Sequence, residues 1–283
     1  MCRKGRRLHR VRATKCTDAI VDQEEYMVET LFQSLETSGL LPGFLASRPA
    51  SDSEYPHSIP WTAISALALA SATLWLYLRL YHPVVNPFPW SMSPTPEGRA
   101  ADRKCKVVLA GSFNPPHRGH LAMLEHLSRR YGDVIAVVGM NSSKSYDVTP
   151  QQRADLLRAM VDDEGNGTKG KVRVEIVEGY IWKFAMAEGV SIMFRGIRTW
   201  EKDGVEERHL QLLNTWGPMM YGPLRWPLPT QFLEGKPEYN HISSTLIRDI
   251  CKGKGGKLSG KNRSELLALV PDVAADRIAT AYS

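Results

Sequence analysis

The chain has 283 residues, enough for one good-sized domain with additional segments. Its 36 basic and 30 acidic residues are mostly intermixed and leave a net charge of +6. This balance suits a small anionic ligand and does not require a nucleic acid as partner. The four cysteines form no Cys-x-x-Cys pair, so the sequence does not indicate a zinc site, and we expect no protein-bound metal.

The N-terminal region is basic. Residues 1–17 contain seven Lys or Arg and no Asp or Glu. Such a stretch is typical of an organelle-targeting presequence, of a patch for anionic lipid or of a disordered basic tail, and the sequence does not separate the three. A helix within 20–46 and a polar linker over 48–60 follow. We therefore expect residues 1–60 to form a basic, largely flexible region.

An apolar stretch comes next. No Asp, Glu, Lys or Arg occurs from Tyr55 through Leu78. As a helix, residues 61–78 would span about 27 Å, close to the roughly 30 Å of a bilayer core. Aromatic residues lie near both ends, as at membrane interfaces. A buried core helix is the alternative, but no neighbouring segment looks able to cover it on all sides. The sequence therefore predicts a single transmembrane helix over 61–82.

The flanks of this helix suggest its orientation. More Lys and Arg residues follow it than precede it, which places the C-terminal side in the cytosol or an organelle matrix. A mitochondrial membrane is one candidate. Residues 83–104 contain five prolines and predict an extended tether. A single domain is then expected over 105–283.

Within that domain, strand-like and helix-like segments alternate. We expect strands at 107–110, 134–138, 172–177 and 191–194, and helices at 117–130, 150–161, 181–187, 205–213 and from about Ser243. Thr149 and Pro150 are the cap and first-turn signals of the second of these helices. The alternation predicts an α/β fold, a parallel sheet with helices on both faces. In such folds ligands bind beyond the carboxyl ends of the strands.

The most informative stretch runs from Gly111 to His120 and reads Gly-Ser-Phe-Asn-Pro-Pro-His-Arg-Gly-His. It joins a predicted strand to a predicted helix, whose N-terminus offers backbone N–H groups and a positive dipole end to phosphate. His117 and His120 lie on one face of that helix. An isolated pair of histidines is more often structural, but the strand and turn before it favour chemistry on a polyphosphate. Polar loops at 139–144, 195–198 and 239–248 are expected at the same edge.

These residues resemble the T/H-x-G-H signature of the adenylyl- and cytidylyltransferase superfamily, here His117-Arg118-Gly119-His120. The order and spacing of the four loops, over about 106–250, most resemble phosphopantetheine adenylyltransferases of coenzyme A synthesis. The resemblance implies a Rossmann-like sheet. Adenylyl transfer brings two anionic phosphates together in line, so it needs positioning and positive charge rather than a protein nucleophile.

The resemblance also implies roles for particular residues. The expected catalytic residues are His120, Lys144 and Arg195. The expected ATP contacts are Ser112, Phe113, His117, His120, Gly196, Arg198, Glu207, Ser243, Ser244 and Thr245. The expected acceptor contacts are Ser112, Lys144, Ile181 and Arg195. Taken singly, a loop lysine, an arginine in an ion pair and a serine at a helix start each have a structural explanation. Their order at successive strand ends favours the functional one.

The implied reaction is adenylyl transfer from ATP to 4′-phosphopantetheine, giving dephospho-coenzyme A and pyrophosphate, with Mg²⁺ accompanying ATP. Two other enzymes of the superfamily are alternatives: a nicotinamide or nicotinate mononucleotide adenylyltransferase, whose motifs are also similar, and a cytidylyltransferase of lipid-precursor synthesis. A membrane-tethered nucleotide-binding protein without catalysis is the alternative of another class. The sequence leaves homo-oligomerisation open.

Overall fold

The computed structural model describes residues 65–73, 83–140, 146–163, 165, 167–221, 228–252 and 260–283. Pro83–Ser283 belong to one compact unit, and residues 65–73 belong to another. The predicted basic region 1–60 and the loop that carries Lys144 lie outside the described residues.

Part of the predicted transmembrane span is described. Residues 65–73 are helical, and the Thr73 hydroxyl donates to the Leu69 carbonyl at 2.7 Å. The other residues of the expected span, 61–64 and 74–82, lie outside the described part. Among the helices described here, none has the length and apolar character needed to cross a membrane. The anchor over 61–82 stays a prediction.

The larger unit is built on one parallel sheet of six strands in the order β1-β6-β5-β2-β3-β4. The strands are β1 (Val84–Asn86), β2 (Lys106–Gly111), β3 (Asp133–Gly139), β4 (Val172–Val177), β5 (Ile192–Ile197) and β6 (Thr230–Glu234). The central strands β2 and β3 are runs of Val, Ile, Leu and Ala buried on both faces, as expected for a covered parallel sheet.

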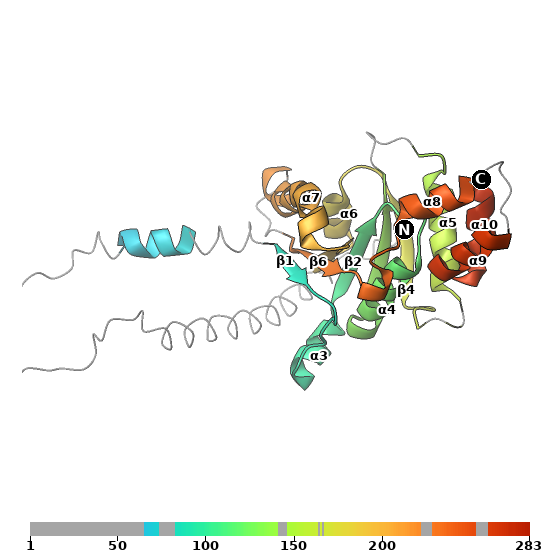
Figure 1. Ribbon diagram of the computed structural model, residues 1–283. Coiled ribbons are helices and arrows are strands. Elements are labelled where there is room, and N and C mark those ends of the chain that lie inside the picture. The colour runs from blue at the N-terminus through green and yellow to red at the C-terminus, as the bar shows by residue number, and fades with distance from the viewer. Residues whose placement is uncertain are drawn as a thin grey trace, which may run out of the picture. The chain divides into compact units, whose positions relative to one another are not determined.

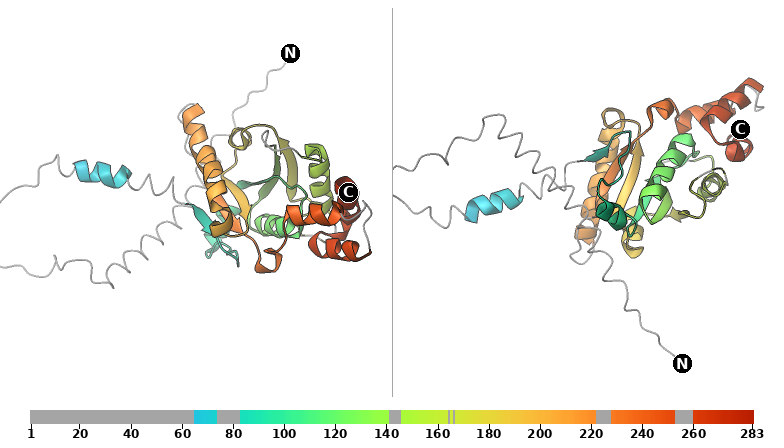
Figure 2. Two further views of the ribbon diagram at one scale, coloured as in Figure 1. Left: turned by 45° about the horizontal axis from the view of Figure 1, so that its top comes forward. Right: turned by 90° about the horizontal axis from the view of Figure 1, so that it is seen from below.

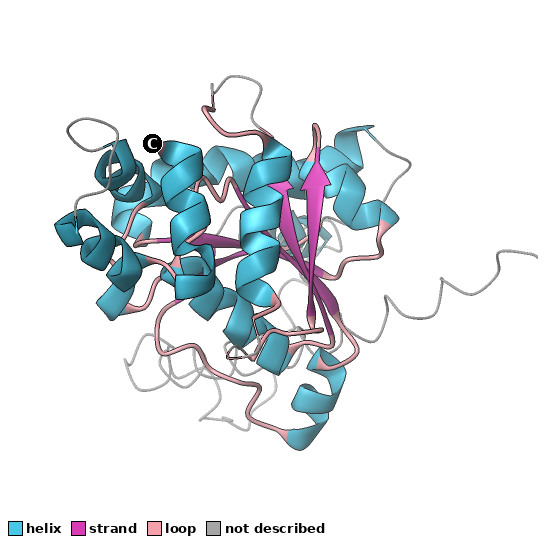
Figure 3. Ribbon diagram, turned by 90° about the vertical axis from the view of Figure 1, so that its right-hand side faces the viewer, coloured by secondary structure: helices cyan, strands magenta, loops and turns pink. Residues whose placement is uncertain are grey.

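Helices cover both faces of this sheet (Figure 1). They are α3 (Pro96–Asp102), α4 (Arg118–Arg130), α5 (Pro150–Val161), α6 (Ile181–Ala187), α7 (Trp200–Tyr221), the 3₁₀ turn η1 (Pro237–Tyr239), α8 (Ser244–Lys252), α9 (Gly260–Leu269) and α10 (Asp272–Tyr282). The chain moves one way along the sheet through α4 and α5, and the other way through α6 and α7. Because parallel crossovers are right-handed, the two pairs lie on opposite faces. Figures 2 and 3 show the same layers of helices around the sheet. Helix α10 lies against α5, α8 and α9. The α/β prediction is confirmed.

Helix α5 shows how local sequence sets these elements. The Thr149 hydroxyl accepts from the Gln152 N–H at 3.2 Å, and the Gln152 side chain accepts from the Thr149 N–H at 2.9 Å. This reciprocal capping box, with Pro150 in the first turn, begins the helix where the sequence predicts it.

The segment 83–104, expected to be an extended tether, has secondary structure instead. Strand β1 pairs with β6, and the Asn86 side chain donates to Gln231 Oε1 at 3.2 Å and to the Phe232 carbonyl at 3.1 Å. Prolines are tolerated on the edge strand of a sheet and in the first turn of a helix, where Pro96 stands after its cap, Thr95. These positions explain why proline content misled the prediction.

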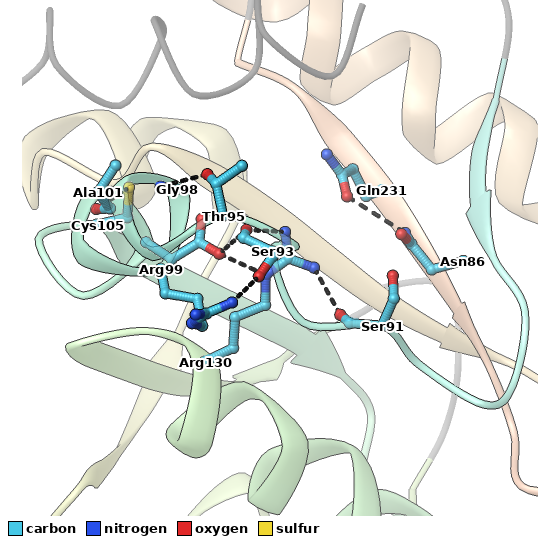
Figure 4. Close-up of polar contacts among 11 residues, drawn as sticks. Asn86, Ser91, Ser93, Thr95, Gly98, Arg99, Ala101, Cys105, Arg130 and Gln231 are labelled. Carbon is cyan, nitrogen blue, oxygen red and sulfur yellow. Dashed lines mark hydrogen bonds and ion pairs between the residues drawn. The ribbon is translucent and has the colours of Figure 1, made fainter. Parts of the chain in front are cut away.

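We call residues 83–105 the strap, because they run from β1 to β2 while contacting the domain between them. The Trp90 indole donates to the Glu234 carbonyl at 2.9 Å. The Asp102 carboxylate accepts from the Ser93 hydroxyl and from Arg130 Nε, the latter at 2.8 Å. Figure 4 shows Ser93 and Arg130 close together among these polar contacts. The folded domain therefore begins at the strap rather than at residue 105.

Two further elements differ from the expectation. Strand β5 continues through Arg195 and Gly196 to Ile197, and α7 is longer than the predicted 205–213. The segment 216–236, in which no strand was expected, includes the end of α7 and strand β6. In β6 Phe232 and Leu233 are buried beside β5, so this strand is part of the core.

Candidate active site

The strand order contains a switch point at β2, where the connections to the neighbouring strands run to opposite sides. β2 lies between β5 and β3, and the chain leaves β2 toward β3 but later passes to β5 on its other side. In open parallel sheets ligands bind outside the carboxyl ends of the strands at such a point. Arg195 pairs in register with Ala110, one residue before β2 ends. The Gly111–His120 stretch and the β5 arginines therefore meet at this edge.

Phe113 forms the turn after β2. Its φ of +46° lies in the left-handed region, which is a strained conformation for an aromatic residue. Its side chain is buried, and its ring lies so close to Gly111 that a Cβ there would come within 3.2 Å of it. Ser112, just before it, is exposed. Packing of the buried Phe113 ring thus stabilises a strained turn in which Ser112 is exposed.

The loop at 112–117 depends on distant side chains for its hydrogen bonds. Pro115 and Pro116 have no N–H, so this loop has few donors of its own. Side chains from α5 and α8 supply donors to three of its carbonyls. The pairs are Arg153 to Ser112, Arg248 to Asn114 and, at 2.9 Å, Ser244 to Pro115. Hydrogen bonds from α5 and α8 therefore fix the backbone of this loop.

The two motif histidines lie against each other, with ring centroids 3.7 Å apart. Burial lowers the pKa of His120 to about 4, and burial together with His120 lowers the pKa of His117 well below its usual value. Both rings are therefore neutral near pH 7. The His117 backbone N–H donates to His120 Nδ1 at 3.3 Å. Because Nδ1 is the acceptor, the proton of neutral His120 is on Nε2, which is left as a donor.

Gly119 makes this histidine pair possible. A Cβ at this position would lie 3.1 Å from both Cε1 and Nδ1 of the His117 ring. That separation is tighter than most contacts of real Cβ atoms, so the ring would have to move. The glycine of the motif is therefore explained by packing of the His117 ring over the first turn of α4.

Carboxylates from the start of α7 hold the two arginines at the end of β5. Arg195 donates through Nε and Nη2 to both oxygens of Glu207, with 2.8 Å between Nη2 and Oε1. Arg198 is paired with Asp203, which also accepts from the Arg198 backbone N–H at 2.7 Å. Such two-point pairs fix the plane of a guanidinium. Among the described residues, Arg195 Nη1 has no partner.

A family model for cytidylyltransferase-like proteins matches residues 108–250, half of the chain. The chain belongs to this family. It is 30% identical over 146 residues to the phosphopantetheine adenylyltransferase of Aquifex aeolicus, covering 52% of this chain and 82% of that one. It is 28% identical over 177 residues to the same enzyme of Rubrobacter xylanophilus, covering 62% and 94%. The Plasmodium falciparum nicotinic acid mononucleotide adenylyltransferase complexed with NaAD superposes with a TM-score of 0.43 at 13% identity, covering 62% and 95%.

The chain is thus a nucleotidyltransferase similar to phosphopantetheine adenylyltransferases, and its expected site residues can be placed on the fold. Ser112, Phe113, His117, His120, Arg195, Gly196 and Arg198 follow or end β2 and β5. Glu207 lies on α7 against Arg195, and Ile181 begins α6 next to Gly139. Lys144 lies outside the described residues. The fold places these residues but does not test whether they bind a ligand, so their roles stay predictions.

The serine-rich start of α8 has structural bonds of its own. The Ser243 hydroxyl accepts from the Leu246 N–H at 3.1 Å and so caps the helix. Ser244 is bonded to Pro115, as described above. Thr245 is exposed, and its hydroxyl accepts from Arg248 Nη2 at 3.1 Å. Thr245 therefore has the most accessible side chain of the three.

Three residues that bond to the loop were not among the expected site residues. They are Arg153, Arg248 and Tyr282. The sequence carries a signal for Arg153, which lies on the apolar stripe of α5 with Leu156, Leu157 and Met160. A single arginine among the apolar residues of this stripe indicates a buried side chain with a specific hydrogen-bond partner. Tyr282 is 168 residues away from its partner Asn114, and no local pattern links the two.

Proposed function

We propose that this protein transfers the adenylyl group of ATP to 4′-phosphopantetheine, giving dephospho-coenzyme A and pyrophosphate in coenzyme A biosynthesis. The observation that carries the proposal is the similarity of 146 and 177 residues of this chain to two phosphopantetheine adenylyltransferases, over 82% and 94% of their lengths. The neutral histidine pair at the start of α4, beside the β5 arginines, supports it independently.

In the proposed reaction an oxygen of the acceptor phosphate attacks the α-phosphorus of ATP. A new P–O bond forms, the bond between the α- and β-phosphates breaks, and pyrophosphate leaves. His120 donates from Nε2 to a phosphate oxygen of ATP, and its neutral state means that it acts as a hydrogen-bond donor. Arg195, oriented by Glu207, presents Nη1 to the acceptor phosphate. Lys144 adds positive charge on the acceptor side.

We propose that Mg²⁺ enters with ATP, where it neutralises phosphate charge. In the described part of the chain, no three His, Cys, Asp or Glu side chains are grouped as a metal site. Two carboxylates near the β5 end, Glu207 and Asp203, are engaged by arginines. The donor set therefore fits a metal carried by the nucleotide better than one held by a protein cage.

Pyrophosphate release by the full-length chain tests the proposal. The chain is supplied with Mg²⁺-ATP and, in parallel, with phosphopantetheine, nicotinamide mononucleotide or nicotinate mononucleotide. We expect release with phosphopantetheine alone, abolished by His120→Ala and retained in His209→Ala, a matched control at an exposed histidine of α7. Release with a mononucleotide instead would move the enzyme to dinucleotide synthesis, the alternative whose Ser-Phe-Asn-Pro-Pro-His motif is also similar. ATP binding without release for any acceptor would favour a binding protein without catalysis.

We also propose that residues 61–82 anchor the enzyme to a membrane, with the domain facing the cytosol or an organelle matrix and a mitochondrial membrane as a candidate. The support is the uncharged stretch up to Leu78 and the basic residues after it. Fractionation of cells that express the full chain tests this. A chain that lacks 61–82 should leave the membrane fraction, and retention there would contradict the anchor.

A further inference from the structure

Tyr282 of α10 contacts the active-site loop directly. Its hydroxyl donates to Asn114 Oδ1 at 2.7 Å, and both residues are buried, with exposed fractions of 2% and 8%. Burial raises the pKa of Tyr282 above its usual range, so the hydroxyl keeps its proton and remains a donor. A helix outside the 108–250 family match therefore makes a buried hydrogen bond to the signature loop.

The position of Asn114 allows its hydrogen bond with Tyr282 to influence both the turn at Phe113 and the start of α4. It follows the strained Phe113 directly and lies three residues before His117. Its backbone carbonyl is held by Arg248, so its main chain and its side chain are bonded to different helices. A shift of Asn114 would therefore move the turn on one side and the start of α4 on the other.

Arg153 supports the same loop from α5. Its guanidinium is fully buried, donates through Nη1 to the Ser112 carbonyl and lies 4.4 Å from the centre of the Tyr146 ring. Nε and Nη2 have no hydrogen-bond partner among the described residues. A buried cation without a carboxylate is costly, so its presence under the loop calls for a role beyond packing.

We propose that Tyr282 and Arg153 are positioning residues for nucleotidyl transfer. From α10 and α5 they fix Asn114 and Ser112, the two ends of the turn around Phe113, and thereby set the position of the histidines that receive the nucleotide phosphates. Both side chains are buried and act through the loop rather than on substrate. The inference rests on the proposed function for its turnover assay, but its ATP-binding assay does not.

Tyr282→Phe in the full-length chain is the test, because it removes one hydroxyl and keeps the ring. Since a misplacement of about 1 Å can cost on the order of a hundredfold in rate, we expect about a tenfold loss of kcat/KM and a similar weakening of ATP binding. Tyr131→Phe is the matched control: it also removes a buried tyrosine hydroxyl, at the end of α4 away from the loop. It should keep wild-type turnover and ATP affinity.

A double-mutant cycle separates positioning from stability. If Tyr282 acts through Asn114, then Tyr282→Phe should cost nothing further in an Asn114→Ala background. Arg153→Lys, which keeps the charge but loses the planar fork, should likewise weaken ATP binding. A lowered Tm with unchanged ATP affinity and kcat/KM in Tyr282→Phe would overturn the proposal. Should the wild type release no pyrophosphate with any acceptor, the proposed function fails, and calorimetric ATP titration of the same variants still decides this inference.

Discussion

The buried His126 predicts a specific acid sensitivity of this domain. It lies on α4 with 6% of its surface exposed, under the Trp90 ring of the strap at 5.2 Å between ring centroids. Burial, together with the positive charges of Arg130 and Arg129, lowers its pKa from 6.5 to about 4. Protonation of His126 therefore works against the folded state.

The sign and size follow from this difference. In the unfolded chain the imidazole binds a proton near pH 6.5, whereas the folded chain binds it only near pH 4. Between these values the unfolded state binds more protons, so the free energy of unfolding decreases as the pH falls from 6.5 to 4 and levels off outside this window. The whole difference corresponds to about 3 kcal/mol, of which about 2 kcal/mol is lost between pH 7 and pH 5.

His126→Leu should remove this contribution while keeping an apolar contact with Trp90. Denaturant unfolding of the full-length wild type and variant at pH 7 and pH 5 measures it, and the variant should lose about 2 kcal/mol less than the wild type over that interval. His209→Leu, at an exposed histidine, should behave like the wild type. An equal acid loss in His126→Leu, or an NMR titration of His126 near pH 6.5, would refute the reasoning.

Three other changes test particular contacts of the site and of the strap. Gly119→Ala should change the free energy of unfolding by less than about 1 kcal/mol, yet lower kcat/KM about tenfold by displacing the His117 ring; unchanged turnover would mean that the ring position is immaterial. Glu207→Gln should raise the KM for the acceptor because Arg195 loses its orientation, whereas a raised KM for ATP alone would assign Glu207 to the nucleotide. A chain that begins at residue 105 should melt at a lower temperature than one that begins at 83, and equal melting would contradict the strap as part of the fold.

Elements with strong local signals could be predicted from the sequence. Helix α5 has a capping box, a first-turn proline and an apolar stripe, and its predicted bounds of 150–161 agree with the structure. Strands β2 and β3 are continuous apolar runs, and each is followed along the chain by a segment whose apolar residues recur at helical spacing. In each case the local preference and the buried face agree, so that short-range pattern is enough.

The strap and β6 could not be predicted in this way. The proline content of 83–104 is the same whether the segment is an extended tether or an edge strand followed by a helix. Pairing of residues 84–86 with β6, which is distant in sequence, makes this segment an edge strand rather than a tether. The five residues of β6 include a half-buried Gln231 and Glu234, so their strand character depends on β5 beside them rather than on their own alternation.

For the site, the sequence predicted which residues gather at the sheet edge, because the motif and the strand ends follow local order. It did not predict which side chains pair with each other. The bidentate contact of Arg195 with Glu207 and the neutral state of His120 depend on burial and on partners that only the folded chain brings together. Local pattern predicts which residues form the candidate site, and tertiary contacts determine the charge of those that the structure describes.

These contacts also bear on how large the functional unit is. The family match covers 108–250, and the Gly111–His120 stretch lies inside it. However, Asn114 of that stretch is bonded to Tyr282, which follows the match, and the Trp90 ring that precedes the match covers His126 on the helix that begins at the motif. Three carbonyls of the loop accept from Arg153, Ser244 and Arg248, which lie within the match, whereas the Asn114 side chain accepts from Tyr282 beyond it. The motif therefore lies wholly within the matched region, but the contacts that pack the loop and α4 also come from the strap before the match and from α10 after it.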